Sequence, residues 1–198
     1  MIKHFFVLLL VVLFPVTGVT GEMDARTQFE LARKYETGRG VKKDFAMALN
    51  FYRSAAEAGY APAQSTLGYL YLYAEGVPQD LKQALEWNQK AADAGDAYGQ
   101  LNLGVMYDEG TGVPEDDQTA NAWYQKAVEL GQPRAQLNLG VNYWKGQGIA
   151  QDRVKAYRLF TTVRMTSKDR SARWAARGAL DALTKEMTKE ELKEAKNR

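Results

Sequence analysis

Apolar and small residues recur along the chain with a step of 36 residues. A leucine followed by a small residue occurs at Leu31-Ala32, Leu67-Gly68, Leu103-Gly104 and Leu139-Gly140. Four further series follow the same step: Tyr35, Tyr71, Tyr107 and Tyr143; Asp44, Asp80, Asp116 and Asp152; Ala48, Ala84, Ala120 and Ala156; Gly59, Gly95 and Gly131. A repeat of this length indicates a solenoid, because one unit cannot bury its own apolar face and must stack on its neighbours.

Each unit is predicted to contain two helices, which we name helix A and helix B. In the second unit, apolar residues at helical spacing predict helix A over 61–73. Gly76 and Pro78 end that helix, and Asp80 stands where the N-cap of helix B belongs. Helix B extends to about Ala94, and Gly95 supplies a residue that adopts the left-handed conformation at low cost.

The sequence therefore predicts an all-α fold, a right-handed α-solenoid of about four and a half helix-turn-helix repeats with a C-terminal capping helix. The repeats are expected at 25–59, 60–95, 96–131 and 132–167, and the cap at 168–198, within a single domain of residues 22–198. The cap begins with a fifth helix A over 169–183, in which Ala175-Ala176 replaces the Leu-Gly pair. A capping box of Thr188 and Glu191 predicts a charged last helix over 189–197.

Glycine recurs in the middle of helix A, where it is less favourable than alanine by about 1 kcal/mol. This recurrence predicts that the backbone of helix A closely approaches a large side chain of helix B. We expect that side chain from the series Phe51, Trp87, Trp123 and Leu159.

The first 21 residues have the pattern of a secretory signal peptide. Lys3 precedes an apolar run from Phe5 to Phe14, and Pro15 and small residues follow as far as Gly21. Cleavage after Gly18 or Gly21 would leave a periplasmic or secreted protein. An uncleaved anchor is the alternative, although the run is shorter than the roughly 20 apolar residues that span a bilayer.

The composition excludes several common chemistries from the exported chain. There is no Cys, and the only His is His4, within the predicted signal peptide. Ser-His and Cys-His nucleophile pairs are therefore absent, as are zinc sites that depend on imidazole or thiolate. We expect no catalytic residue, no metal and no cofactor. The four aspartates of the repeat are interpreted as helix caps, because groups one repeat apart do not converge on one substrate.

Charge argues against nucleic acid as a partner. The chain has 26 Lys and Arg against 24 Asp and Glu. From Arg164 onward the balance is ten against six, whereas residues 22–163 hold fifteen against eighteen. Nucleic-acid-binding proteins usually carry a strongly basic stripe, which this nearly balanced distribution does not provide.

The repeating unit A-x-x-x-L-G-x-x-Y-x-x-G-x-G-V-x-x-D-x-x-x-A-x-x-W-x-x-x-A-x-x-x-G resembles the Sel-one-like repeat, a branch of the tetratricopeptide repeat superfamily. Residues 99–116 are close to the family consensus, and the resemblance covers nearly the whole chain after residue 21. Ala74 departs from it by replacing a loop glycine, and the Cys pair that some members carry in each repeat is absent. The resemblance implies an exported bacterial protein that binds other proteins, with no membrane span once the signal peptide is removed.

Solenoids of this family line a concave groove with helix A, and partners usually bind there. We expect groove residues at offsets −5, −2, +2, +5 and +6 from the repeated leucine. The candidates are an aromatic centre, an acidic pair and basic residues, namely Tyr69, Tyr73, Tyr98 and Trp144; Asp108 and Glu109; Arg33, Arg134, Lys145, Arg173 and Arg177. Tyr, Trp and Arg dominate binding hot spots. At Leu101, Leu137 and Val141 we expect packing against the neighbouring helix A instead.

These observations predict a non-enzymatic scaffold or adaptor that binds a peptide, loop or domain of another protein. Family relatives include inhibitors that neutralise secreted lipase-like toxins, so an immunity-type role is one specific form of this prediction. Envelope assembly or cell-wall binding is an alternative, with the aromatic residues as a sugar-stacking surface. A weak β-lactam hydrolase, by analogy with Cys-rich relatives, is a further alternative that the absence of Cys pairs disfavours. The oligomeric state is left open.

Overall fold

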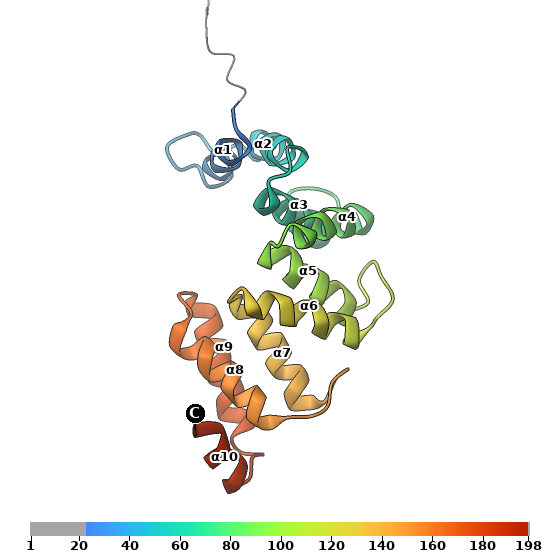
Figure 1. Ribbon diagram of the computed structural model, residues 1–198. Helices are drawn as coiled ribbons and strands as arrows, with labels where there is room; N and C mark the ends of the chain where they lie inside the picture. The colour runs from blue at the N-terminus through green and yellow to red at the C-terminus, as the bar shows by residue number, and fades with distance from the viewer. Residues whose placement is uncertain (1–22, 198) are drawn as a thin grey trace, which may run out of the picture.

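The computed structural model describes residues 23–197, which form ten helices (Figure 1). Their bounds are α1 Ala25–Thr37, α2 Phe45–Glu57, α3 Ala61–Tyr73, α4 Leu81–Asp93, α5 Ala97–Asp108, α6 Asp117–Glu129, α7 Pro133–Lys145, α8 Arg153–Thr166, α9 Arg170–Leu183 and α10 Lys189–Lys196. The predicted signal peptide, residues 1–21, lies outside the described residues. No helix within 23–197 is long and apolar enough to cross a membrane.

The helices pack in the order of the chain. Each odd-numbered helix from α1 to α7 pairs with the next even-numbered helix, and each even-numbered helix as far as α8 also packs on the odd-numbered helix that follows. The helices α3, α5, α7 and α9 additionally contact one another in turn, so they form one continuous layer. This arrangement confirms the predicted all-α solenoid, in which the odd-numbered helices are the A helices and the even-numbered ones the B helices.

The repeated aspartates begin the B helices, as predicted. The side chain of Asp80 accepts a 3.0 Å hydrogen bond from the backbone N–H of Gln83. Its own backbone N–H donates to the carbonyl oxygen of Tyr71 at 3.1 Å, so the same residue closes the loop that precedes the helix. Asp44, Asp116 and Asp152 repeat both contacts with their own helices and with the carbonyl oxygens of Tyr35, Tyr107 and Tyr143. A local sequence pattern therefore sets the start of every B helix.

The mid-helix glycines do face large side chains of helix B, but the predicted series is displaced by one residue. A Cβ atom added to Gly104 would overlap the ring of Tyr124, and one added to Gly140 would overlap the ring of Phe160. At Gly68 the opposing residue is the amide of Asn88. The predicted Trp87 and its equivalents are only partly buried instead, because one residue turns a helix by about 100°.

The fifth helix A, α9, begins one residue later than the 36-residue step requires. The N-caps Asp96 and Gln132 each precede the repeated leucine by seven residues, and Asp169 precedes Ala176 by the same distance. The extra residue lies in α8, which has 14 residues where α2, α4 and α6 have 13. Ala176, which is fully buried, therefore takes the place of the leucine, and Arg177 takes the place of the glycine. The predicted alignment of Ala175-Ala176 with Leu-Gly was wrong by one position.

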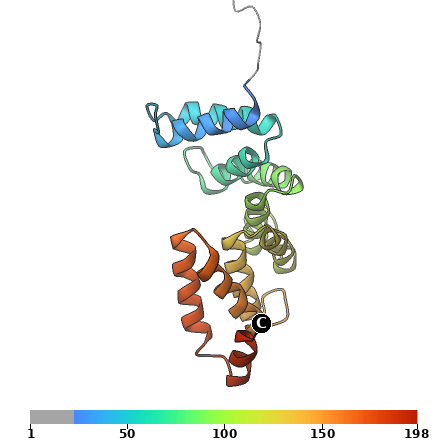
Figure 2. The same ribbon diagram turned by 60° about the vertical axis from the view of Figure 1, so that its left-hand side comes forward.

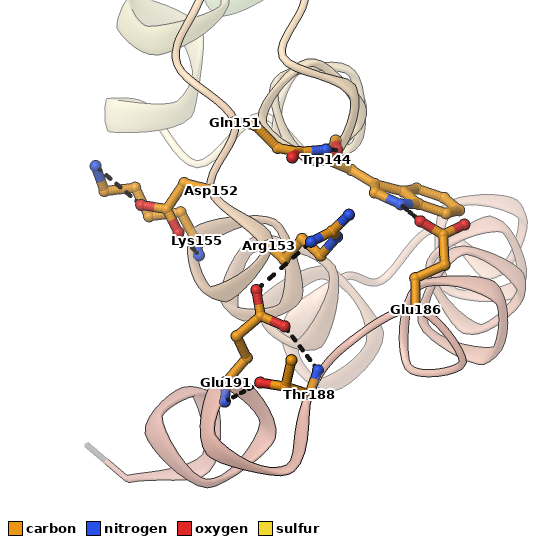
Figure 3. Close-up of polar contacts among 8 residues, drawn as sticks. All are labelled: Trp144, Gln151, Asp152, Arg153, Lys155, Glu186, Thr188 and Glu191. Atoms are coloured by element: carbon orange, nitrogen blue, oxygen red, sulfur yellow. Dashed lines mark hydrogen bonds and ion pairs between the residues drawn. The ribbon is translucent and has the colours of Figure 1, made fainter.

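The last helix, α10, packs on α8 rather than on α9. Thr188 and Glu191 form the predicted capping box, with hydrogen bonds of 2.7 and 3.1 Å (Figure 3). The guanidinium of Arg158 donates to the carbonyl oxygen of Glu194 at 2.9 Å, and Arg153 lies 3.7 Å from the carboxylate of Glu191. The helix α10 was expected to cap the solenoid. Because it packs on α8, it does not cover the outer side of α9.

Candidate functional site

Residues at offsets −2 and +5 from the repeated leucine pack between consecutive A helices. Leu101 is buried in one cluster with Ala135 and Leu139 of α7. The ring of Phe29, at the same offset in α1, lies 5.3 Å from the ring of Tyr60, the N-cap of α3. These two offsets therefore belong to the interface between repeats and not to a groove.

Asp108, at offset +5 and predicted to line the groove, takes part in the contact between repeats. Its carboxylate accepts hydrogen bonds from the hydroxyl of Tyr124 and from the side-chain amide of Asn142, both at 3.3 Å. Asn142 also donates to the side chain of Asn121 at 2.9 Å. Burial, followed by the nearby carboxylate of Asp108, raises the pKa of the Tyr124 phenol above its usual range. Asp108 thus connects the third repeat to the fourth.

Trp144, the other candidate at offset +5, holds the C-terminal part of the chain. Its indole N–H donates to the carboxylate of Glu186 at 2.8 Å (Figure 3). Its ring meets the ring of Phe160 edge-on, with centroids 6.5 Å apart. Trp144, which was predicted to line the groove, thus contacts the connection between α9 and α10.

The two arginines of α9 that were predicted to line the groove make contacts within the C-terminal part of the chain. Arg173 donates to the carbonyl oxygen of Ser167 at 2.7 Å and so satisfies the end of α8. Arg177 stands at the glycine position of the repeat, with its guanidinium 3.9 Å from the carboxylate of Asp181. Both side chains of this ion pair are about three quarters exposed, so the pair adds little to stability.

The structure does bring four of the predicted residues together, at offsets −5, +2 and +6. We name Tyr69, Tyr73, Glu109 and Arg134 the groove cluster. The rings of Tyr69 and Tyr73 lie 4.7 Å apart on α3. Glu109 follows the end of α5, and Arg134 lies in the first turn of α7. The cluster thus spans three consecutive A helices, and Tyr73 is 45% exposed.

The charges of the cluster act on its two phenols in opposite directions. Partial burial raises the pKa of Tyr69, and a 3.1 Å hydrogen bond from its hydroxyl to Glu75 adds to the effect. Burial likewise raises the pKa of Tyr73, followed by the negative charge of Glu109. The positive charge of Arg134 acts on both phenols in the opposite direction. Both hydroxyls therefore remain protonated at neutral pH, between an acidic and a basic group.

The remaining candidates lie at the same three offsets and are exposed. Tyr98, at offset −5 on α5, exposes 61% of its surface. Arg33, at offset +2 on α1, and Lys145, at offset +6 on α7, are also exposed. Glu75 was missed as a member of this surface because it lies in the loop after α3, and its contact with Tyr69 follows from the turn of that loop. Within residues 23–197, no group of His, Cys, Asp and Glu side chains is arranged to hold a metal ion.

Solved structures of similar sequence share this architecture. A protective antigen of uropathogenic Escherichia coli with an SLR fold is 33% identical, with a TM-score of 0.76 over 86% of this chain. A Sel1 repeat protein of Oxalobacter formigenes is 31% identical, with a TM-score of 0.70, over 88% of this chain and 71% of the other. Helicobacter pylori cysteine-rich protein B is 25% identical, with a TM-score of 0.51, over 69% of this chain and 98% of the other. This chain spans only 36% of the length of the Escherichia coli protein.

A comparison with curated proteins gave no match. The model of the Sel1 repeat matches residues 25–60, 61–96, 97–132 and 133–162, which together make up most of the chain. Repeats of this kind form scaffolds that typically serve as protein-interaction modules. The four matched segments correspond to the helix pairs described above, with their closed loops and glycine contacts. The chain belongs to the Sel1 repeat family.

Proposed function

We propose that this protein is an exported, non-enzymatic scaffold whose groove cluster holds a segment of another protein. The observation that carries the proposal is the convergence of Tyr69, Tyr73, Glu109 and Arg134 from three repeats onto one exposed surface. Export rests on the signal-peptide pattern, in which Lys3 precedes the apolar run of Phe5 to Phe14.

The chemistry of the cluster fits a polypeptide better than a small apolar ligand. The tyrosine rings supply flat surface at low entropic cost, and their protonated hydroxyls can donate to carbonyl oxygens of a bound segment. Arg134 is suited to a carboxylate of the partner, and Glu109 to a basic side chain. Tyr98 extends the aromatic surface along α5. Such a surface selects a segment that carries both charges around an apolar residue.

Affinity capture from envelope extract, followed by mass spectrometry, tests this proposal. We expect one protein to be retained by the wild type and lost with Tyr73→Ala and with Arg134→Glu. Lys126→Ala is the matched control, because Lys126 lies over the ring of Trp123 on a B helix, away from the cluster. If the captured protein binds both groove variants as tightly as the wild type, the groove cluster is not the binding site.

Two narrower roles fit within or beside this proposal. An immunity-type inhibitor would capture a secreted toxin that is encoded beside this protein, and binding would abolish the activity of that toxin. A cell-wall ligand would instead stack sugar rings on the exposed faces of Tyr73 and Tyr98. Sedimentation of the protein with purified peptidoglycan, and its loss with Tyr73→Ala and Tyr98→Ala, would favour the second role.

A further inference from the structure

On the outer side of α9, a position that packs against the next helix A in the other repeats is exposed. With Ala176 at the leucine position, Trp174 lies at offset −2, the position of Phe29, Ser65, Leu101 and Leu137. Leu137 packs against Ala172 and Ala176 of the following helix A. Within residues 23–197 no further helix A follows α9, and Trp174 is 79% exposed. A tryptophan thus occupies a stacking position that no helix within the described residues covers.

Gly178 is a second feature that the fold does not account for. The other mid-helix glycines, Gly68, Gly99, Gly104 and Gly140, each have a side chain or backbone packed where a Cβ atom would lie. At Gly178 a Cβ atom would meet nothing within 4 Å. Gly178 still weakens the helix relative to alanine. It lies one turn from Trp174, so a large exposed side chain and an unfilled notch share one helix face.

We propose that a second copy of this chain packs on this face, with the two α9 helices antiparallel and Trp174 of each copy in the notch at Gly178 of the other. A twofold axis level with Ala176 places residues 174 and 178 opposite each other. The pairing would repeat a contact found in the interior at Gly104 and at Gly140, where an aromatic ring fills the space beside the glycine. The same pairing accounts for both the exposure of Trp174 and the open space at Gly178.

The charges on the same face fit the same axis. Arg170 lies six residues before Ala176 and Asp181 five residues after it. In the antiparallel pair they face each other to within one residue, which is about 1.5 Å along the helix. Arg177 falls beside Trp174 of the second copy, where a guanidinium is attracted to the indole face. The side chains of Arg177 and Asp181 are 77% and 72% exposed, so both are available for these contacts.

In an alternative arrangement, α9 of one copy would pack on α1 of the next copy. This head-to-tail contact does not offer the same fit. The positions of α1 that would receive α9 are Thr27, Glu30 and Lys34, all exposed. They provide neither a glycine notch nor an apolar surface for Trp174. Such a head-to-tail contact would also continue into filaments, whereas the twofold pair closes on itself. In Figures 1 and 2, α9 lies at the outer edge of the C-terminal part of the molecule, with α8 on its inner side.

Sedimentation equilibrium of the purified protein tests the proposal, and we expect a reversible dimer. Trp174→Ala should raise the dissociation constant of the dimer by at least about tenfold, as expected for a hot-spot tryptophan. Gly178→Leu should abolish the dimer while circular dichroism shows unchanged helix content. Tyr98→Ala, which removes an exposed aromatic from the groove side, is the control and should leave the dimer intact.

A charge exchange makes the test specific to the antiparallel pairing. Arg170→Asp and Asp181→Arg each place like charges opposite each other, so each variant alone should be monomeric. An equimolar mixture of the two should form a heterodimer, and the double variant should regain the homodimer. Both substitutions suit the helix dipole, because they put an acid in the first turn and a base near the last, so α9 is expected to remain folded.

Several results would overturn the proposal. These are a wild-type protein that stays monomeric throughout the concentration series, single charge variants that still dimerise, and a mixture that does not reassociate. Growth beyond two copies would indicate head-to-tail stacking instead. A monomeric chain that captures a different protein through Trp174 would assign the face to that protein. The variants of α9 lie outside the groove cluster, so their failure to change association leaves the proposed function untouched.

Discussion

The side-chain amide of Asn102 donates a 2.9 Å hydrogen bond to the side-chain oxygen of Asn88 in the interior between the second and third repeats. Asn88 is fully buried and stands beside Gly68, where the third and fourth repeats have Tyr124 and Phe160. The second repeat thus replaces a large side chain with a polar pair that reaches across the repeat boundary.

Asn102→Ala should lower the free energy of unfolding by about 1–3 kcal/mol, because it leaves the buried oxygen of Asn88 without a donor. Urea unfolding measures the change, and Asn50→Ala, at an exposed position on α2, is the control. In the double-mutant cycle with Asn88→Ala, the two losses should add to more than the loss in the double variant. Additive losses would mean that the hydrogen bond contributes nothing of its own.

Alanine at two mid-helix glycines should have opposite effects. Gly140→Ala should destabilise the protein by about 1–3 kcal/mol, because the added methyl group overlaps the ring of Phe160. Gly178→Ala should stabilise the monomer by about 0.5–1 kcal/mol through helix propensity, because its Cβ atom meets nothing. Thermal unfolding at low protein concentration, where association does not contribute, compares the two variants. A stabilised Gly140→Ala protein would show that the close contact is not present.

Alkaline pH should destabilise the fold through two buried phenols. Burial, assisted by the carboxylates of Glu36 and Asp108, raises the pKa of Tyr52 and of Tyr124 well above the usual value of 10.0. The folded state therefore favours the protonated phenol, and this contribution is complete below pH 10.0 and is lost as the pH rises towards the folded-state pKa values. Urea midpoints measured from neutral to strongly alkaline pH should fall.

Replacing these phenols should remove part of that decline. Tyr124→Phe introduces the residue that the fourth repeat carries at Phe160, so its packing is tolerated in this environment. Tyr52→Phe and Tyr124→Phe should flatten the decrease of stability with alkaline pH, whatever they do to stability at neutral pH. A decline of unchanged steepness in the double variant would assign it to other groups.

Trp144→Phe should loosen the C-terminal segment without unfolding the repeats. It removes the 2.8 Å hydrogen bond to Glu186, at a cost of about 1 kcal/mol, and keeps an aromatic ring beside Phe160. Hydrogen exchange should accelerate over 184–196 and remain unchanged in α3 to α6. Trp123→Phe is the control on a B helix. Equal exchange in the C-terminal segment of wild type and variant would contradict the role assigned to Trp144.

The repeat, the helix caps and the glycine contacts could be predicted from the sequence because each depends on a short pattern. Asp80 caps α4 and Gly95 follows it with a φ of +79°, as their spacing indicated. The groove could be predicted only in part. The positions on helix A that face the next repeat and those that face the groove are separated by about half a turn of the helix or less. Asp and Trp occur on both kinds of surface, so residue type alone did not place Asp108 and Trp144.

The open side of α9 escaped prediction for a related reason. The 36-residue step aligns Trp174 with Asn102 and Asn138, which face the preceding repeat. The capping aspartate Asp169, one residue beyond that step, was the available indication of the displaced register. Caps therefore define the register of a weak terminal repeat better than its faded core residues do.

The single extra residue of α8 has a consequence for how such a molecule can change over generations. Three additional nucleotides at the end of the last full repeat lengthen α8 by one residue, and α9 moves along the sequence as a whole, because Asp169 and Ala176 keep the seven-residue spacing of the other A helices. The preceding repeats keep their packing, since each contacts only its neighbours. The last repeat of a solenoid can thus accept a change of length and present a surface of its own, while the body of the molecule keeps its packing.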